Sequence, residues 1–183
     1  MPIVTNYLLF SHTYLRQLQA DDGLDQAAAA VAQGVREWHG FKDARSRASL
    51  IETWVTPLLQ ILELDLRPLA AGDGDGYLLY TAWDAETPVG LCYVTPPGAD
   101  LDATTKGRHW MARAVLAARN AQSPIPNPQS PLRWVILTNG DQWRLLDAQA
   151  LRRYEAYLQV DLDRLARAPD DLSALRVFYR CFH

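Results

Sequence analysis

A turn between two strand-like runs constrains the fold of this chain more than any other feature of its sequence. Residues 134–138 read Trp-Val-Ile-Leu-Thr, residues 141–146 end on Trp-Arg-Leu-Leu, and the pair Asn139-Gly140 stands between them. β-Branched and aromatic residues favour strands, and an Asn-Gly pair accepts the positive φ angles of a type I′ turn. The pattern therefore predicts a β-hairpin over residues 134–146, closed by a tight type I′ turn.

Three further segments have the composition of strands. Residues 77–81 and 89–95 are short, rich in β-forming residues and bounded by turn residues, so we expect two neighbouring strands there. Residues 154–160 alternate weakly between apolar and polar side chains, which indicates another strand. Together with the hairpin, these segments predict a sheet.

Apolar residues spaced by three and four mark most of the remaining chain as helical. They predict helices over residues 6–19, 24–38, 46–64 and 104–120, and a last helix from about residue 170 onward. Pro57 should kink or restart the third helix, because proline lacks the N–H that an inner helical turn needs. Four prolines in residues 122–131 predict a loop. The order of elements indicates one α/β (α+β) domain over residues 1–183, with a mixed central sheet flanked by helices.

Composition excludes several classes of protein. With 49% hydrophobic and 21% charged residues, the chain fits a soluble globular protein and not a disordered or collagen-like one. No uncharged run reaches the ~20 residues of a membrane-spanning helix, and residues 1–10 lack the features of a secretory signal. We therefore expect a cytoplasmic protein with no membrane partner. Cys92 and Cys181 lie in apolar stretches, so we interpret them as small buried hydrophobes.

Charge is distributed unevenly along the chain. Residues 1–100 contain 6 Lys and Arg against 13 Asp and Glu, whereas residues 101–183 contain 12 against 8. The basic half permits contact with phosphate but does not by itself indicate a dedicated nucleic-acid binder.

Lys42 and Lys106 are the only lysines. The sequence also contains no phosphate-binding glycine loop and no metal-ligand spacing of His and Cys, so it predicts no metal site of those kinds.

The run over residues 134–146 resembles a segment of a known family. It is similar to the W-x-I-L-T-N-G-x-x-W-R-L segment in the N-terminal PD-(D/E)XK nuclease-type domain of restriction-modification proteins, which carry an adenine-specific DNA methyltransferase on the same chain. Residues 10–15, 50–64 and 154–179 resemble further parts of that domain, so the resemblance covers nearly the whole chain. Its specificity depends mostly on the Thr-Asn-Gly hairpin. The resemblance implies a restriction-endonuclease-like fold at the N-terminus of a longer methyltransferase that uses S-adenosylmethionine.

The family's catalytic pattern can be compared residue by residue with this chain. Such nucleases place an acid at the start of one strand and a Glu-x-Lys pair on the next, so that two carboxylates hold Mg²⁺ and the lysine supports the attacking water. The resemblance matches Asp75 to the first acid and Glu52 to an acid that some members carry on the preceding helix. Tyr93 and Thr95 stand where the glutamate and lysine are expected. The resemblance therefore implies a vestigial nuclease site without a bound metal.

Two alternatives to a lost site remain open. An active Mg²⁺-dependent endonuclease would need Glu52, Asp75 and further residues that the sequence does not identify. A shifted register would use Asp84 and Glu86, although both lie in an expected turn. Neither lysine belongs to the two expected strands.

The basic half offers a candidate DNA-binding surface on one predicted helix. Arg108, Arg113 and Arg119 are spaced along residues 104–120 and would contact phosphates, although spaced arginines are also common on solvated helix faces. Trp143 and Arg144 are interpreted as packing and as a charge at a sheet edge.

These observations lead to one main hypothesis and two alternatives. The main hypothesis is a catalytically degenerate nuclease-type domain of a restriction-modification or phage-defence DNA methyltransferase, which engages DNA or scaffolds the methyltransferase domain in cis. The alternatives are an active Mg²⁺-dependent endonuclease domain and a stand-alone protein-interaction module. A downstream N-P-P-Y-type methyltransferase motif would separate the first from the last.

Overall fold

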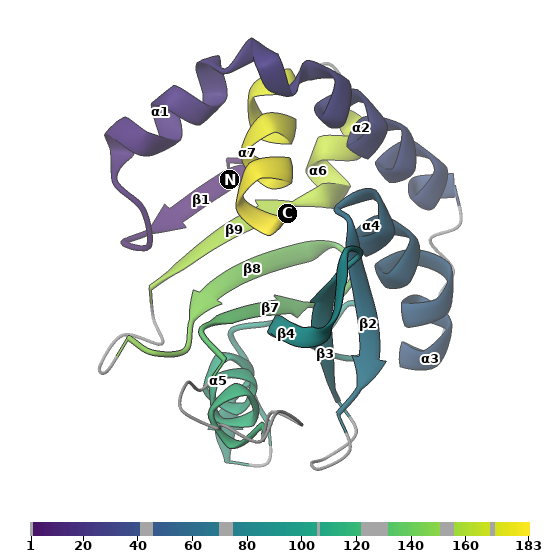
Figure 1. Ribbon diagram of the computed structural model, residues 1–183, viewed down its shortest axis with the longest axis vertical. Coiled ribbons are helices and arrows are strands. Elements are labelled where there is room, and N and C mark those ends of the chain that lie inside the picture. Colours follow the sequence, from purple (N-terminus) through teal and green to yellow (C-terminus); the bar gives the residue numbers. More distant parts are fainter. Residues whose placement is uncertain are drawn as a thin grey trace.

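Seven strands form one mixed sheet in the computed structural model of this chain, which describes residues 2–40, 46–69, 75–105, 107–121, 132–150, 156–168 and 171–183. Figure 1 shows this sheet, whose strand order is β1-β9-β8-β7-β4-β3-β2. Strands β4 and β7 are parallel, and the other neighbours are antiparallel. The strands are β1 (Val4–Tyr7), β2 (Leu64–Pro68), β3 (Gly76–Thr81), β4 (Asp84–Val94), β7 (Trp134–Thr138), β8 (Gln142–Asp147) and β9 (Tyr157–Asp161).

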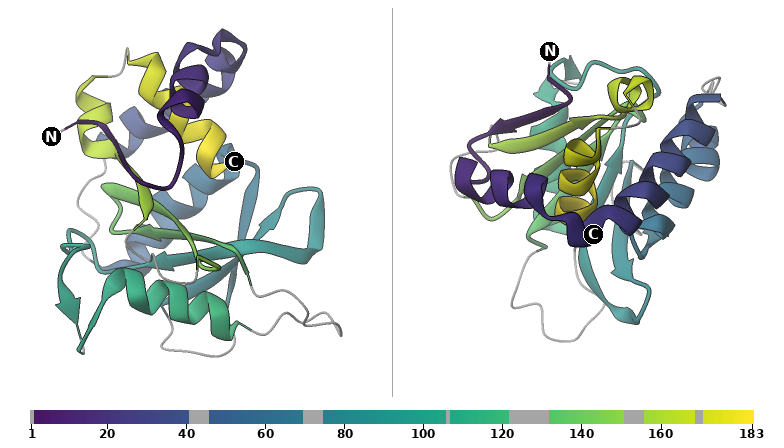
Figure 2. Two further views of the ribbon diagram at one scale, coloured as in Figure 1. Left: turned by 90° about the vertical axis from the view of Figure 1, so that its left-hand side faces the viewer. Right: turned by 90° about the horizontal axis from the view of Figure 1, so that it is seen from above.

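Helices cover both faces of this sheet, as Figures 1 and 2 show. Helix α5 (Trp110–Asn120) packs on one face through a core that includes Trp110, Ala114 and Val115. The other face is covered by α1 (His12–Ala20), η1 (Asp22–Leu24), α2 (Asp25–Gly40), α3 (Arg47–Leu50), the π-helical turn η2 (Ile51–Val55), α4 (Thr56–Ile61), α6 (Leu162–Arg167) and α7 (Leu172–Phe182). The expected mixed sheet flanked by helices is confirmed. Within the described ranges, no helix has the length and apolar character needed to cross a membrane.

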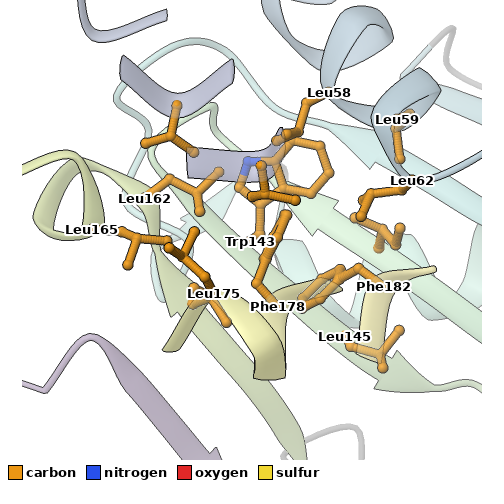
Figure 3. Close-up of a cluster of buried hydrophobic side chains, with 14 of the residues drawn as sticks. Leu58, Leu59, Leu62, Trp143, Leu145, Leu162, Leu165, Leu175, Phe178 and Phe182 are labelled. Atoms are coloured by element: carbon orange, nitrogen blue, oxygen red, sulfur yellow. The ribbon is translucent and has the colours of Figure 1, made fainter. Parts of the chain in front are cut away.

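Trp143 occupies the centre of the larger core (Figure 3). Its side chain is fully buried and meets the rings of Phe178 and Phe182 edge-on, at centroid distances of 5.7 and 6.3 Å. Packing was the expected role of Trp143, and it is confirmed. Cys92 is fully buried in the same core, whereas Cys181 is only partly buried.

The N-terminal segment differs from the prediction. Helix α1 begins at His12, after an N-cap at Ser11, and the preceding residues form strand β1 instead of the expected first helical turn. Among the described residues, strand β1 pairs with β9 alone, from which it is separated by about 150 residues of sequence. The helical spacing that includes Asn6 and Tyr7 is misleading, because this distant pairing decides the conformation of these two residues.

The helix predicted over residues 46–64 runs from Arg47 to Ile61 and contains a π-helical turn. Pro57 lies in the first turn of α4, and the turn before it, η2, is π-helical. A proline cannot donate to the carbonyl four residues earlier, and the departure from α-helical hydrogen bonding comes in the turn before it. The backbone stays helical at Val55 and Thr56, so the helix continues through Pro57 and does not restart there. The helix ends at Ile61, Glu63 adopts a φ of 56°, and the chain then enters β2, which the sequence did not predict.

The helix predicted over residues 104–120 is correct only from Trp110 onward. A small two-stranded ribbon precedes it, formed by β5 (Thr104–Thr105) and β6 (Arg108–His109), with Gly107 at a φ of 74°. The last helix, α7, begins at Leu172, close to the expected position, and Asp171 caps it; α6 is an additional short helix. The predicted loop at residues 122–131 and both lysines lie outside the described residues.

The hairpin over residues 134–146 is confirmed, but its predicted turn type is wrong. Asn139 does not have a positive φ, and only Gly140 of the pair does, at 99°. The Asn139 side chain forms the turn instead, because its Oδ1 accepts the N–H groups of Asp141 and Gln142. The Gly140 carbonyl accepts the indole N–H groups of Trp54 and Trp143, at 2.9 and 3.1 Å. The turn is therefore buried against the helices, and tertiary contacts determine its geometry.

Candidate functional site

The β3–β4 hairpin brings Asp75 and Tyr93 together. Asp75 directly precedes β3, where Gly76 pairs with Tyr93 of β4, and the Asp75 carbonyl accepts the N–H of Val94 at 3.0 Å. The Tyr93 hydroxyl donates to Asp75 Oδ2 at 3.1 Å. The residue at the expected glutamate position therefore contacts the first acid, but as a neutral hydrogen-bond donor.

Two guanidinium groups hold the Asp75 carboxylate. Arg113 Nη2, from α5, lies 3.1 Å from Oδ2, and Arg47, from α3, forms an ion pair with Oδ1. The side chains of Asp75 and Arg113 are only 13% and 10% exposed, whereas Arg47 is partly exposed. Asp75 thus connects helices from both faces of the sheet, and each of its oxygens faces a cation. We call Asp75, Arg47, Arg113 and Tyr93 the Asp75 cluster.

Aromatic rings fix the position of Arg113. Its guanidinium carbon lies 4.7 Å from the centroid of the Trp110 ring and 5.7 Å from that of Tyr93. A guanidinium stacked on aromatic faces and paired with a carboxylate has lost most of its freedom to reorient.

The three arginines of the expected DNA-binding surface have different environments. Arg113 belongs to the Asp75 cluster and is nearly buried, so it is not available on the expected DNA-binding surface. Arg119 donates to the carbonyls of Ala148 and Ala150 at 2.7 and 3.4 Å, beyond the end of β8. The backbone of Arg108 lies in β6, and its side chain is outside the described part of the structure. Two of the three guanidinium groups are therefore engaged within the protein.

Thr95, at the expected lysine position, is fully buried. Its hydroxyl donates to the carbonyls of Thr138 and Pro96 at 3.2 and 3.3 Å, and its N–H donates to Thr138 at 2.9 Å. The residue attaches the end of β4 to the Thr-Asn-Gly turn. A lysine ammonium would be costly in this enclosed position.

The remaining candidate acids lie on other elements than Asp75. Glu52 lies on η2 and is exposed. Asp84 begins β4, at the end of the hairpin opposite Tyr93, and its Oδ1 accepts the N–H groups of Glu86 and Thr87. These bonds, the one from Glu86 first, lower the pKa of Asp84. Among the residues that the structure describes, no three His, Cys, Asp or Glu side chains are grouped as metal ligands would be.

Arg144 is a second buried cation, and its expected role as an edge charge is wrong. Strand β8 is interior, between β7 and β9, and the Arg144 side chain is only 3% exposed. It donates to both oxygens of Asp102 at 2.8 and 3.0 Å and to Gln159 at 2.7 Å. Its guanidinium also stacks on the Tyr157 ring at 4.5 Å. The pair attaches the loop after β4 to the sheet.

The Asp102–Arg144 pair should make stability depend on pH. Hydrogen bonds from Arg144 hold the pKa of Asp102 below its ordinary value of 3.8. A lowered folded-state pKa stabilises the fold above the unfolded pKa, and this contribution is lost as the pH falls through the folded pKa. Asp102→Asn should therefore lower the free energy of unfolding by about 1 kcal/mol at neutral pH, a small amount because the carboxylate is 65% exposed. Urea denaturation should show this difference shrinking in acid, and a pH-independent difference would contradict the assignment.

Sequence reasoning found Asp75 and Tyr93 but missed Arg47. Arg47 precedes Asp75 by 28 residues of sequence, with η2, α4 and β2 between them, and nothing in its local pattern marks it. Comparison with family models, with curated proteins and with solved structures gave no match for this chain.

Proposed function

We propose that this chain is a catalytically inactive nuclease-type domain of a restriction-modification or phage-defence adenine-specific DNA methyltransferase. Its nuclease centre would have been replaced by a structural ion-pair cluster. The main support is the Asp75 cluster, which places two guanidinium groups and a tyrosine hydroxyl around the acid that the family uses for metal. The resemblance of residues 134–146 supplies the family, and S-adenosylmethionine would belong to the methyltransferase domain.

The chemistry of the cluster argues against a metal site. Mg²⁺ requires several oxygen ligands and gives up its water reluctantly, so it needs carboxylates that are not neutralised. Arg47 and Arg113 both repel a dication from Asp75, and Tyr93 adds no charge to attract one. The cluster instead joins α3, α5 and the β3–β4 hairpin.

Scaffolding of the methyltransferase domain in cis is the role that the arginine contacts favour. Arg113 and Arg119 are engaged by protein oxygens, and other exposed arginines are paired with aspartates, for example Arg133 with Asp147 and Arg167 with Asp163. Such pairing weakens the positive field that attracts a phosphate backbone. DNA engagement is the alternative role.

The purified chain is expected to leave supercoiled plasmid intact in the presence of Mg²⁺ or Mn²⁺. Calorimetry should also show no site-specific metal uptake, because Asp75 is already neutralised. The matched control is Asp75→Ala, which should behave like the wild type in the cleavage assay. Nicking by the wild type that this substitution abolishes would overturn the proposal in favour of an active endonuclease.

Duplex DNA binding separates the two roles. Fluorescence anisotropy at low salt is expected to detect little binding if the domain is a scaffold. Affinity that falls steeply as the salt concentration is raised would instead indicate that side chains of the protein neutralise DNA phosphates. Such a result would favour DNA engagement. The variant Arg108→Ala is the appropriate probe in that case, because replacing Arg113 or Arg119 would also remove contacts within the fold.

A further inference from the structure

An apolar pocket of about 360 Å³ opens beside the C-terminal end of α7, on the sheet face opposite α5. Its floor is formed by Leu79, Ile136 and Leu145, which are side chains of the interior strands β3, β7 and β8. Leu62 and Phe182, labelled with Leu145 in Figure 3, line it as well. Small-molecule sites commonly enclose about 300–1,000 Å³ and are mostly apolar with a few polar groups. The pocket has this size and character, and it shares no residue with the Asp75 cluster.

Large apolar side chains around the mouth are exposed to solvent. Trp83, in the β3–β4 turn, Val89 of β4 and Tyr14 of α1 all line the pocket, and all three are among the exposed large hydrophobic residues. Exposed apolar groups that are grouped around a cavity, unlike those scattered singly, indicate a binding site.

Two formally charged side chains, Glu63 and Arg180, line the pocket, and the arginine is the one that can receive an anionic group. Glu63 and His183 lie opposite each other, with Oε2 and Nε2 separated by 3.4 Å, so the carboxylate has a partner. Arg180, in the last turn of α7, also lines the pocket, and it forms no salt bridge within the part of the chain that the structure describes. A ligand with an alkyl chain and an anionic group would complement both the apolar floor and the Arg180 guanidinium, because the chain would pack on the floor while the anionic group contacts the arginine.

We propose that this pocket binds a medium-chain carboxylate, with its alkyl chain on Leu79, Ile136 and Leu145 and its carboxylate at Arg180. This inference is independent of the nuclease-type assignment. Burial of the alkyl chain should supply most of the affinity, and each added methylene should tighten binding about fourfold until the pocket is full. Arg180 is exposed, so its contribution to the binding affinity is modest. Its main effect is to favour an anionic head group over a cationic one.

Calorimetry with octanoate, decanoate and dodecanoate tests the proposal on the whole chain, with decyltrimethylammonium as the probe of opposite charge. The carboxylates should bind with affinity that rises with chain length, and the ammonium should bind more weakly. Arg180→Gln should weaken decanoate binding by about fivefold at most, since a solvent-exposed ion pair contributes little.

A matched pair of exposed positions controls for general effects of a new charge. Val89→Glu, at a position 42% exposed on the rim, should abolish decanoate binding, whereas Leu116→Glu, 39% exposed on α5, should leave it unchanged. Circular dichroism confirms that both variants are folded. The proposal fails if decanoate does not bind, if the ammonium binds as tightly, or if Arg180→Gln or Val89→Glu has no effect. It also fails if Leu116→Glu weakens binding as much as Val89→Glu does.

Discussion

Gly140→Ala is expected to lower the free energy of unfolding by about 2–4 kcal/mol. Gly140 has a φ of 99°, in which an L-residue is strained, and a Cβ at this position would lie 2.7 Å from Leu50 Cδ1. Leu50 is itself buried in the core, so it has little room to move away. The substitution would also disturb the carbonyl that accepts two indole N–H groups. Equilibrium denaturation in urea measures the loss.

Gly98→Ala is the matched control for this substitution. Gly98 also has a positive φ, 68°, but no atom lies within 4 Å of the position that its Cβ would occupy. It should therefore lose only about 1 kcal/mol, from backbone strain. Equal losses at the two glycines would show that the buried contact with Leu50 is unimportant.

Asp75→Asn should lower the free energy of unfolding by about 3 kcal/mol, because it removes the charge that compensates Arg113 and Arg47. The sign of the effect distinguishes a structural carboxylate from a catalytic one. Catalytic groups are commonly held at a cost in stability, so neutralising one is often harmless or stabilising. Thermal and urea denaturation of the two proteins give the sign directly.

Glu52→Gln is the control for Asp75→Asn, because Glu52 is the other acid that the resemblance assigned to the vestigial site. Glu52 is exposed on η2, so its neutralisation should change the free energy of unfolding by less than about 0.5 kcal/mol. A large loss at Glu52, or a gain at Asp75, would contradict the structural role of the cluster.

The position of the candidate site could be predicted from sequence, but its chemical state could not. The spacing between Asp75 and Tyr93 follows from two short strands joined by a turn, and antiparallel pairing brings their ends together. The partners of Asp75 come from α3 and α5, on opposite faces of the sheet. Which cations reach a carboxylate depends on how the helices pack, and local sequence patterns carry no such information.

The same division applies to the whole fold. The sequence by itself determined the elements whose conformation depends on near neighbours, such as the hairpin of β7 and β8, strand β3 and helices α2 and α7. Only the tertiary structure decided that residues 4–7 and 64–68 form the two edge strands, since each is short and is held by pairing with one other strand. It also decided the turn at Gly140, where helix packing against Leu50 and Trp54 replaces the intrinsic preference of an Asn-Gly pair. The physical reason is that a few residues have small local preferences, whereas burial and hydrogen bonding to distant segments contribute more free energy and therefore prevail.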